Sequence, residues 1–191
     1  MAARAAGRAI SYRFRRDRKG WRVFATTDMA APRPASMRGN GAIGVDINGG
    51  HLAVAEIDRF GNLVASRRIG CLTYGLTREQ AKAHSGDAVT EIAAWAQAQG
   101  KPIVIETLDF ARKKAETESR PGGRRGNRRL SGFAYAKIAE GLRSAAFRRG
   151  VEVIAVNPAY TSTIGAVNYA RRHGISVHCA AALAIARRGL G

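Results

Sequence analysis

The chain has 191 residues, a hydrophobic fraction of 46% and a formal net charge of +18 at pH 7. That length favours one domain with a small appendage, and that hydrophobic fraction is enough for a folded core. A charge this positive predicts a polyanionic partner, with nucleic acid favoured over an acidic membrane surface.

Several other classes of protein are excluded by the sequence. It contains no run of about 18 apolar residues that could cross a membrane, and its start has no apolar segment typical of a secretory signal. Its two cysteines, Cys71 and Cys179, lie in different motifs and form neither a disulfide framework nor a zinc ribbon. We therefore expect no membrane partner and a location in a reducing cytoplasm.

The first forty residues are strongly basic, with ten Lys and Arg against two acids. Residues 9–14 and 21–26 are predicted as strands of a β-hairpin, with a turn over 16–20 that ends in Gly20. Residues 27–42 contain Pro32 and Pro34 and are predicted as a linker. A hairpin by itself is marginally stable, so it should pack on something or belong to a larger domain.

The middle of the chain predicts a three-stranded meander. Residues 42–48, 52–57 and 63–69 are short apolar runs, separated by the turns Asn48-Gly49-Gly50 and 58–62. Residues 41–110 carry six Lys and Arg against eight acids, so this part is slightly acidic.

Helices and strands are then predicted to alternate. Thr77 and Gln80 have the spacing of a capping box, Asp87 can cap a second helical stretch, and Gly100 ends it. The remaining predictions are a strand at 102–106, a loop or lid at 111–130, helices at 131–150, 166–172 and 178–188, and a strand at 151–156. This order predicts an α/β fold with a mixed five-stranded sheet covered by helices and preceded by a short β-hairpin.

Two carboxylates lie where charge is costly. Asp46 is inside the first apolar run of the meander, and Glu106 ends the predicted strand at 102–106. A buried carboxylate needs a cation, hydrogen bonds or a metal ion. If the two strands are neighbours, both carboxylates meet and can hold a divalent ion for phosphodiester hydrolysis. The alternative is structural: Asp46 caps the following turn and Glu106 pairs with an arginine.

Three segments resemble a known family of nucleases. GVDINGGHLAVAEIDRFGN, PIVIETLDFARKK and the stretch from RRLSGFAYAKI to NPAYTST follow, in order and spacing, the motifs of RuvC domains. Over residues 41–191 the chain resembles the RuvC-like nuclease domain of the TnpB-related proteins of bacterial insertion sequences, relatives of the type V CRISPR effectors. The resemblance implies an RNase H-like fold and RNA-guided, Mg²⁺- or Mn²⁺-dependent cleavage of DNA.

The family's catalytic and metal-binding positions are carried over to Asp46, Glu106 and His178. His178 stands where the family more often has an aspartate, and the alternative for it is a helix-capping or surface histidine. His51, His84 and His173 are interpreted as structural. The four-cysteine zinc ribbon of the family is absent from the sequence, which is typical of a divergent branch.

Residues 1–40 correspond to the end of the barrel that precedes the nuclease domain in the family. The resemblance therefore implies missing N-terminal domains or another subunit, DNA and a guide RNA as partners, and a place at the prokaryotic nucleoid. Two basic regions are candidate nucleic-acid contacts: the lid at 111–130 and the hairpin. Their residues are Arg112, Lys113, Lys114, Arg120, Arg124, Arg125, Arg128, Arg129, Arg13, Arg15 and Arg16.

Three functions remain open at this point. The first is a metal-dependent DNA endonuclease, and the second is a catalytically inactive relic that holds nucleic acid. The third is a phosphotransferase of the actin-like or sugar-kinase kind, which shares the Gly44-x-Asp46 hairpin. Such phosphotransferases need two similar domains, so this third function is the least favoured.

Overall fold

The computed structural model describes residues 9–28, 30–71, 75–107 and 132–191. The chain divides into two compact units, Met1–Pro32 and Arg33–Gly191. None of the helices in the described ranges is long and apolar enough to cross a membrane.

The smaller unit is the predicted hairpin. β1 (Ile10–Asp17) pairs in antiparallel register with β2 (Gly20–Thr27), and Phe14 lies opposite Val23. The Asp17 carboxylate accepts a hydrogen bond from the backbone of Lys19 at 2.8 Å, which holds the turn. Because side chains alternate between the faces of a hairpin, one face carries exposed apolar groups. These are Tyr12, Phe14, Trp21 and Val23, all more than half exposed.

The larger unit is built on a five-stranded sheet in the order β5-β4-β3-β6-β7. β3 (Ala42–Ile47), β4 (His51–Ile57) and β5 (Leu63–Gly70) form an antiparallel meander. β6 (Ile103–Glu106) runs parallel to β3, and β7 (Val153–Val156) runs parallel to β6. The mixed five-stranded sheet predicted from the sequence is thus confirmed.

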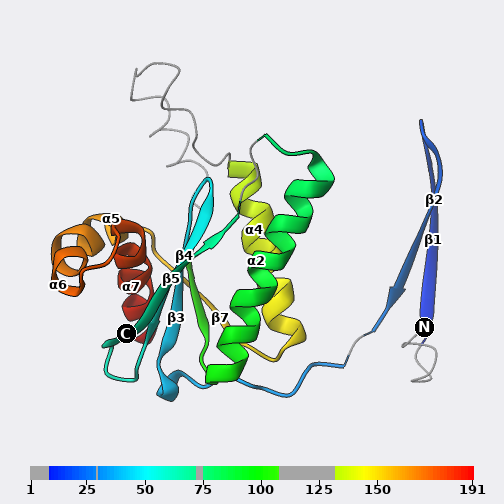
Figure 1. The fold of residues 1–191 in the computed structure, drawn as a ribbon. Helices are drawn as coiled ribbons and strands as arrows, with labels where there is room; N and C mark the ends of the chain where they lie inside the picture. The colour runs from blue at the N-terminus through cyan, green and yellow to red at the C-terminus, as the bar shows by residue number, and fades with distance from the viewer. Residues whose placement is uncertain (1–8, 29, 72–74, 108–131) are drawn as a thin grey trace. The chain divides into compact units, whose positions relative to one another are not determined.

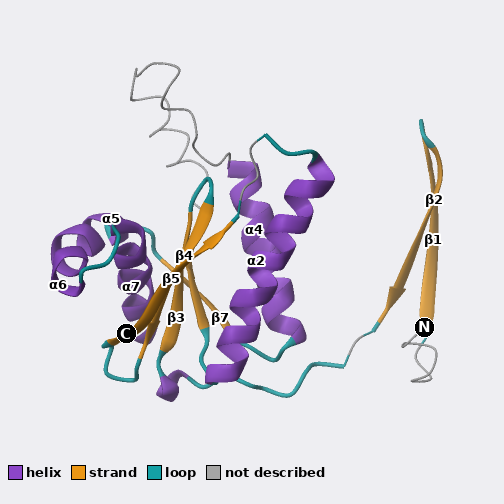
Figure 2. Cartoon of the chain, in the orientation of Figure 1, coloured by secondary structure: helices purple, strands orange, loops and turns teal. Residues whose placement is uncertain are grey.

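Helices cover both faces of this sheet (Figure 1). α2 (Arg78–Gln99) and α4 (Gly132–Arg148) lie on one face, and α7 (Val177–Leu190) lies on the other. Beside α7 the chain winds through α5 (Thr161–Ile164), the π-helical turn η2 (Gly165–Ala170) and α6 (Arg171–His173), as Figure 2 shows. A short 3₁₀ turn, η1 (Arg38–Asn40), precedes β3.

The alternation of side chains along the central strands separates the core into two layers. Ile43 and Val45 of β3 pack with Ile105 of β6 in the layer beneath α2 and α4. Ala42 of β3 and Val104 of β6 belong to the layer beneath α7. Residues 44, 46 and 106 share this second face, so the two predicted catalytic carboxylates both face α7.

Glycine lets α7 approach β3 closely. A Cβ on Gly44 would lie 2.6 Å from the backbone nitrogen of Ala186 and would also overlap the carbonyl oxygen of Ala182. Near the other end of α7, a Cβ on Gly189 would lie 2.8 Å from a methyl group of Val104. At Gly44 the backbones of β3 and α7 are therefore in close contact, and at Gly189 the helix backbone lies against the Val104 side chain.

Three sequence-based element boundaries are wrong. Asp87 does not begin a second helix, because α2 is continuous from Arg78 to Gln99. The helix predicted at 166–172 begins earlier, at Thr161, and passes through a π-helical turn. The helix predicted at 178–188 continues to Leu190, because Gly189 lies inside α7 and packs against Val104 rather than ending the helix. The predicted lid at 111–130 lies outside the described residues.

The candidate active site

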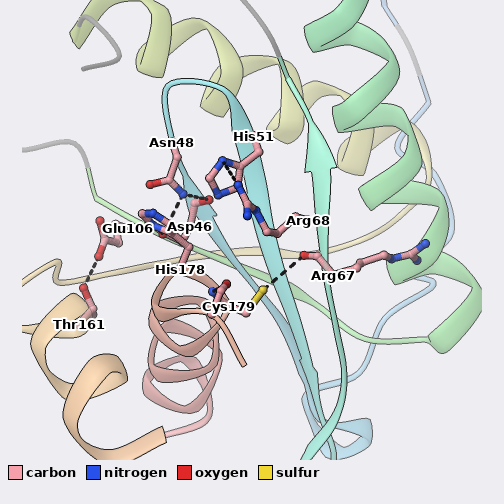
Figure 3. Close-up of polar contacts among 10 residues, drawn as sticks. Asp46, Asn48, His51, Arg67, Arg68, Glu106, Thr161, His178 and Cys179 are labelled. Carbon is pink, nitrogen blue, oxygen red and sulfur yellow. Dashed lines mark hydrogen bonds and ion pairs between the residues drawn. The ribbon is translucent and has the colours of Figure 1, made fainter. Parts of the chain in front are cut away.

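Asp46 lies one residue before the end of β3, and its side chain is 15% exposed. Its contacts within the described ranges are an amide and an imidazole, with no lysine or arginine among them. The Asn48 amide donates to the Asp46 Oδ2 at 2.9 Å, and Nδ1 of His178 lies 3.3 Å from the same oxygen. Figure 3 shows the three side chains converging.

Glu56, a second acid on the central strands, has the contacts expected of a structural carboxylate. Glu56 of β4 is buried, and its Oε1 lies 2.5 Å from the ammonium group of Lys101. Its other oxygen accepts a hydrogen bond from the indole of Trp95 at 3.1 Å. Glu56 is thus paired with a cation within the fold, whereas the described residues give Asp46 one neutral amide and one titratable ring.

Glu106 is the last residue of β6. β3 and β6 pair in parallel with Val45 opposite Ile105, so Asp46 and Glu106 occupy the next position on adjacent strands. Neighbouring strands are about 4.8 Å apart, which brings both carboxylates to one end of the sheet. The predicted convergence of the two acids therefore follows from the register.

Both carboxylates affect the pKa of the Tyr135 phenol. Burial raises the pKa of Tyr135 far above its ordinary value, and the negative charges of Glu106 and Asp46 raise it further. Tyr135 comes from α4, on the other layer of the core. Both influences on the pKa of Tyr135 are consistent with the positions that the register gives to Asp46 and Glu106.

His178 stands in the first turn of α7. Ser176 caps this helix, because its hydroxyl accepts a hydrogen bond from the backbone N–H of Cys179 at 3.2 Å. The close approach of α7 to β3 brings the ring of His178 against Asp46, while 44% of its side chain stays exposed. The structure thus brings His178 into contact with Asp46.

The Glu106 carboxylate is hydrogen-bonded by a residue that is not among the predicted site residues. The hydroxyl of Thr161, which is 1% exposed, donates a short hydrogen bond to Oε1 of Glu106 and lies 3.1 Å from the carbonyl of Pro158. Asn48 is likewise predicted from the sequence only as a turn residue. The signal for both was their place in the motifs: Asn48 is two residues after Asp46, and Thr161 follows NPAY.

His51, at the start of β4, completes the surroundings of His178. The two rings meet edge to face with centroids 5.0 Å apart, and Arg68 lies 3.3 Å from Nδ1 of His51. Burial lowers the pKa of His51, and the nearby Arg68 and His178 lower it further. Among the described side chains, Nε2 of His51 is a buried nitrogen that has no hydrogen-bond partner.

The residue types at this end of the sheet fit a divalent cation. Two carboxylates and an imidazole are ligands that Mg²⁺ or Mn²⁺ accepts in proteins. Within the described ranges, however, no group of three or more His, Cys, Asp or Glu side chains is arranged to hold a metal ion. Asp46 with His178, and Glu106 with Thr161, form two separate hydrogen-bonded pairs on one face.

The predicted nucleic-acid contacts divide between two regions. The eight lid residues, Arg112, Lys113, Lys114, Arg120, Arg124, Arg125, Arg128 and Arg129, lie outside the described residues. The three hairpin residues are described. Arg13 and Arg15 share one face of the hairpin, and the Arg16 guanidinium lies over the Trp21 ring at 5.9 Å on the other.

The fold has similar solved structures. The structure of RuvC from Thermus thermophilus aligns with a TM-score of 0.52 and 17% identity, over 76% of this chain and 90% of that one. T. thermophilus RuvC in complex with a Holliday junction substrate aligns with a TM-score of 0.51 and 16% identity, over 76% and 88%. A Cas12f1–sgRNA–target DNA complex aligns with a TM-score of 0.49 and 15% identity, over 91% of this chain and 55% of that one.

No model of a protein family matches the sequence, and neither does any curated protein. The likeness to T. thermophilus RuvC therefore rests on architecture. The five-stranded sheet with helices on both faces is an RNase H-like fold of the RuvC type.

Proposed function

We propose that this chain is a metal-dependent DNA endonuclease of the kind found in TnpB-related, RNA-guided proteins of insertion sequences. The observation that carries the proposal is the placing of Asp46, Glu106 and His178 at one end of one face of a RuvC-type sheet. A charge of +18 supports a polyanionic substrate. One solved structure of similar fold is T. thermophilus RuvC in complex with a Holliday junction substrate.

Asp46, Glu106 and His178 would hold Mg²⁺ or Mn²⁺, which supplies an activated water and charge neutralisation for phosphodiester hydrolysis. The other side chains orient these three. Asn48 fixes the Asp46 carboxylate, and Thr161 fixes the Glu106 carboxylate. If the Nδ1–H of His178 donates to Asp46, the lone pair of the neutral ring is on Nε2, where it could bind a metal.

The proposal extends to the setting of the enzyme. The hairpin of residues 1–40 is proposed as the remnant of a preceding barrel, and residues 41–191 as the nuclease domain. DNA and a guide RNA are the proposed partners, with further N-terminal domains or another subunit supplying the rest of the guide-binding surface. The proposed site of action is the prokaryotic nucleoid.

A cleavage assay tests the proposed activity. It uses labelled single-stranded DNA, duplex DNA and a four-way junction, each with Mg²⁺, Mn²⁺ or EDTA. Asp46→Asn keeps the size of the side chain and removes its charge, so we expect cleavage to fall by about a hundredfold or more while binding is retained. Asp58→Asn is the matched control, because Asp58 only holds the turn after β4 by accepting hydrogen bonds from Asn62 and Phe60. Equal cleavage by wild type and Asp46→Asn would contradict the proposal.

A non-catalytic nucleic-acid-binding protein is the second candidate. It is favoured by the separation of the carboxylates into two satisfied pairs, Asp46 with His178 and Glu106 with Thr161. This candidate predicts salt-sensitive DNA binding without cleavage in either metal. Metal-dependent cleavage that is lost in Asp46→Asn would exclude it.

A further inference from the structure

Tyr160 combines an unusual backbone with an exposed side chain, and it directly precedes Thr161 in the sequence. It is the single non-glycine residue with a positive φ in the described ranges, with φ 62° and ψ 7°. Its side chain is 71% exposed. An aromatic residue in the left-handed region is strained, and glycine or asparagine would adopt this backbone more readily. Folding alone therefore gives no reason for a tyrosine here.

The turn that carries Tyr160 is held from several sides. The Asn157 side chain accepts a hydrogen bond from the backbone of Ala159 at 2.9 Å. The Arg188 guanidinium donates to the carbonyls of Asn157 and Ala159, the latter at 2.8 Å. The Tyr160 carbonyl accepts from the backbone N–H of Ile164 at 2.8 Å. Strain of this kind persists where the surroundings over-determine the backbone, and it clusters at functional sites.

The turn also ties the Tyr160 backbone to the proposed chemistry. Tyr160 directly precedes Thr161, whose hydroxyl is bonded to Glu106. Consecutive Cα atoms are 3.8 Å apart, so the Tyr160 backbone is fixed to the same buried anchor that positions the carboxylate. A tyrosine ring has few rotatable bonds, which keeps the entropy cost of contact with a ligand low.

The geometry points to Tyr160 as a base-stacking residue, whose ring receives a nucleobase of single-stranded DNA that flanks the phosphate at Asp46 and Glu106. This inference rests on the proposed nuclease function and adds to it a contact for the substrate. Aromatic rings stack on every base, so the contact positions a strand without reading its sequence. Removing such a ring typically costs tenfold or more in affinity.

The test uses the full chain and single-stranded DNA that carries one 2-aminopurine, in EDTA so that nothing is cut. Tyr160→Asn removes the ring and suits the backbone, whereas Tyr160→Phe keeps the ring. Phe60→Asn is the matched control, because Phe60 is also 71% exposed but follows β4 at the opposite end of the sheet. We expect Tyr160→Asn alone to bind about tenfold more weakly and to lose the quenching of 2-aminopurine.

Wild-type binding and quenching by Tyr160→Asn would overturn the inference, as would a wild-type chain that binds no single-stranded DNA. A drop of several degrees in the melting temperature of Tyr160→Asn would show that the ring supports the fold, and would also overturn it. The proposed nuclease activity fails separately. If no metal supports cleavage but Tyr160→Asn still loses quenching, the stacking contact stands in a non-catalytic binding protein.

Discussion

At the scale of single residues, the hydroxyl of Thr161 is the contact that fixes Glu106. Thr161→Val keeps the shape of the side chain but leaves the Glu106 oxygen without this donor, whereas Thr161→Ser keeps the donor. If Glu106 acts in cleavage, we expect Thr161→Val to lower kcat by about tenfold or more, with little change in KM, because the loss is one of orientation. Steady-state kinetics with both variants checks this.

A Thr161→Val enzyme as active as Thr161→Ser would show that Glu106 needs no support from this hydroxyl. The melting temperature of each variant is the control. Thr161 is buried, and its hydroxyl also lies near the carbonyl of Pro158. A loss of kcat without a comparable loss of stability assigns the hydroxyl to positioning.

His178 gives a second prediction at the same scale. Imidazole suits softer cations than Mg²⁺, whereas a carboxylate suits Mg²⁺ well. His178→Asp is therefore expected to raise the ratio of Mg²⁺-supported to Mn²⁺-supported cleavage, and His178→Ala to lower both. Cleavage rates of the wild type and both variants, measured in Mg²⁺ and in Mn²⁺, test this prediction. An unchanged ratio in His178→Asp would mean that His178 caps or pairs with Asp46 without contacting a metal.

At the scale of elements, the approach of α7 to β3 decides whether His178 reaches Asp46. Gly44→Ala places a methyl group against the backbone of Ala182 and Ala186, and we expect the free energy of unfolding to fall by about 1–3 kcal/mol. Gly86→Ala is the matched control inside α2, where a Cβ meets nothing within 4 Å, and it should stabilise by about 1 kcal/mol. Urea unfolding of both variants measures the difference.

The same Gly44→Ala variant also distinguishes an effect on stability from an effect on cleavage. Since α7 must shift, the Asp46–His178 contact should loosen, and cleavage should fall even where the variant is fully folded. Gly44→Ala with wild-type stability would contradict the backbone-to-backbone packing of β3 and α7.

Sequence patterns predict the strands of this fold well and its helix ends less well. Apolar runs between turn signals located all five strands of the sheet, because strand periodicity and turn chemistry are local. The sequence pattern misplaces helix ends at Asp87 and at Arg188, because residue types that cap or end helices, such as Asp87 and Gly189, also occur inside them. Gly189 is required by contact with Val104 of β6, a partner far away in the sequence.

Some features of the candidate site can likewise be predicted from the sequence, and others cannot. Asp46 and Glu106 could be selected from the sequence, since an acid inside a short apolar strand has no local explanation. The contact of Asn48 with Asp46 is local, across two residues, whereas the positions of His51 beside His178 and of Thr161 on Glu106 depend on tertiary packing. Their place in the motifs marks Asn48 and Thr161 as candidates, but the spacing does not say which acid each one contacts, whereas the structure does.

At the scale of the whole molecule, charge governs how the chain meets nucleic acid. Each phosphate contact made by Lys or Arg adds about 0.7 to the slope of log affinity against log salt for single strands. We propose that Arg13, Arg15 and Arg16 of the hairpin make such contacts. Their combined replacement by glutamine should therefore reduce the magnitude of that slope by about 2, with equal loss of affinity for unrelated sequences.

Arg38→Gln is the matched control for this measurement, because the Arg38 guanidinium already lies 2.6 Å from the carboxylate of Glu152. Glu152 raises the pKa of Arg38 and Arg38 lowers that of Glu152, so the two charges compensate each other at neutral pH. An Arg38→Gln chain should keep the wild-type slope. If the hairpin variant also keeps it, the phosphate contacts lie elsewhere in the chain, and the proposed role of Arg13, Arg15 and Arg16 is wrong.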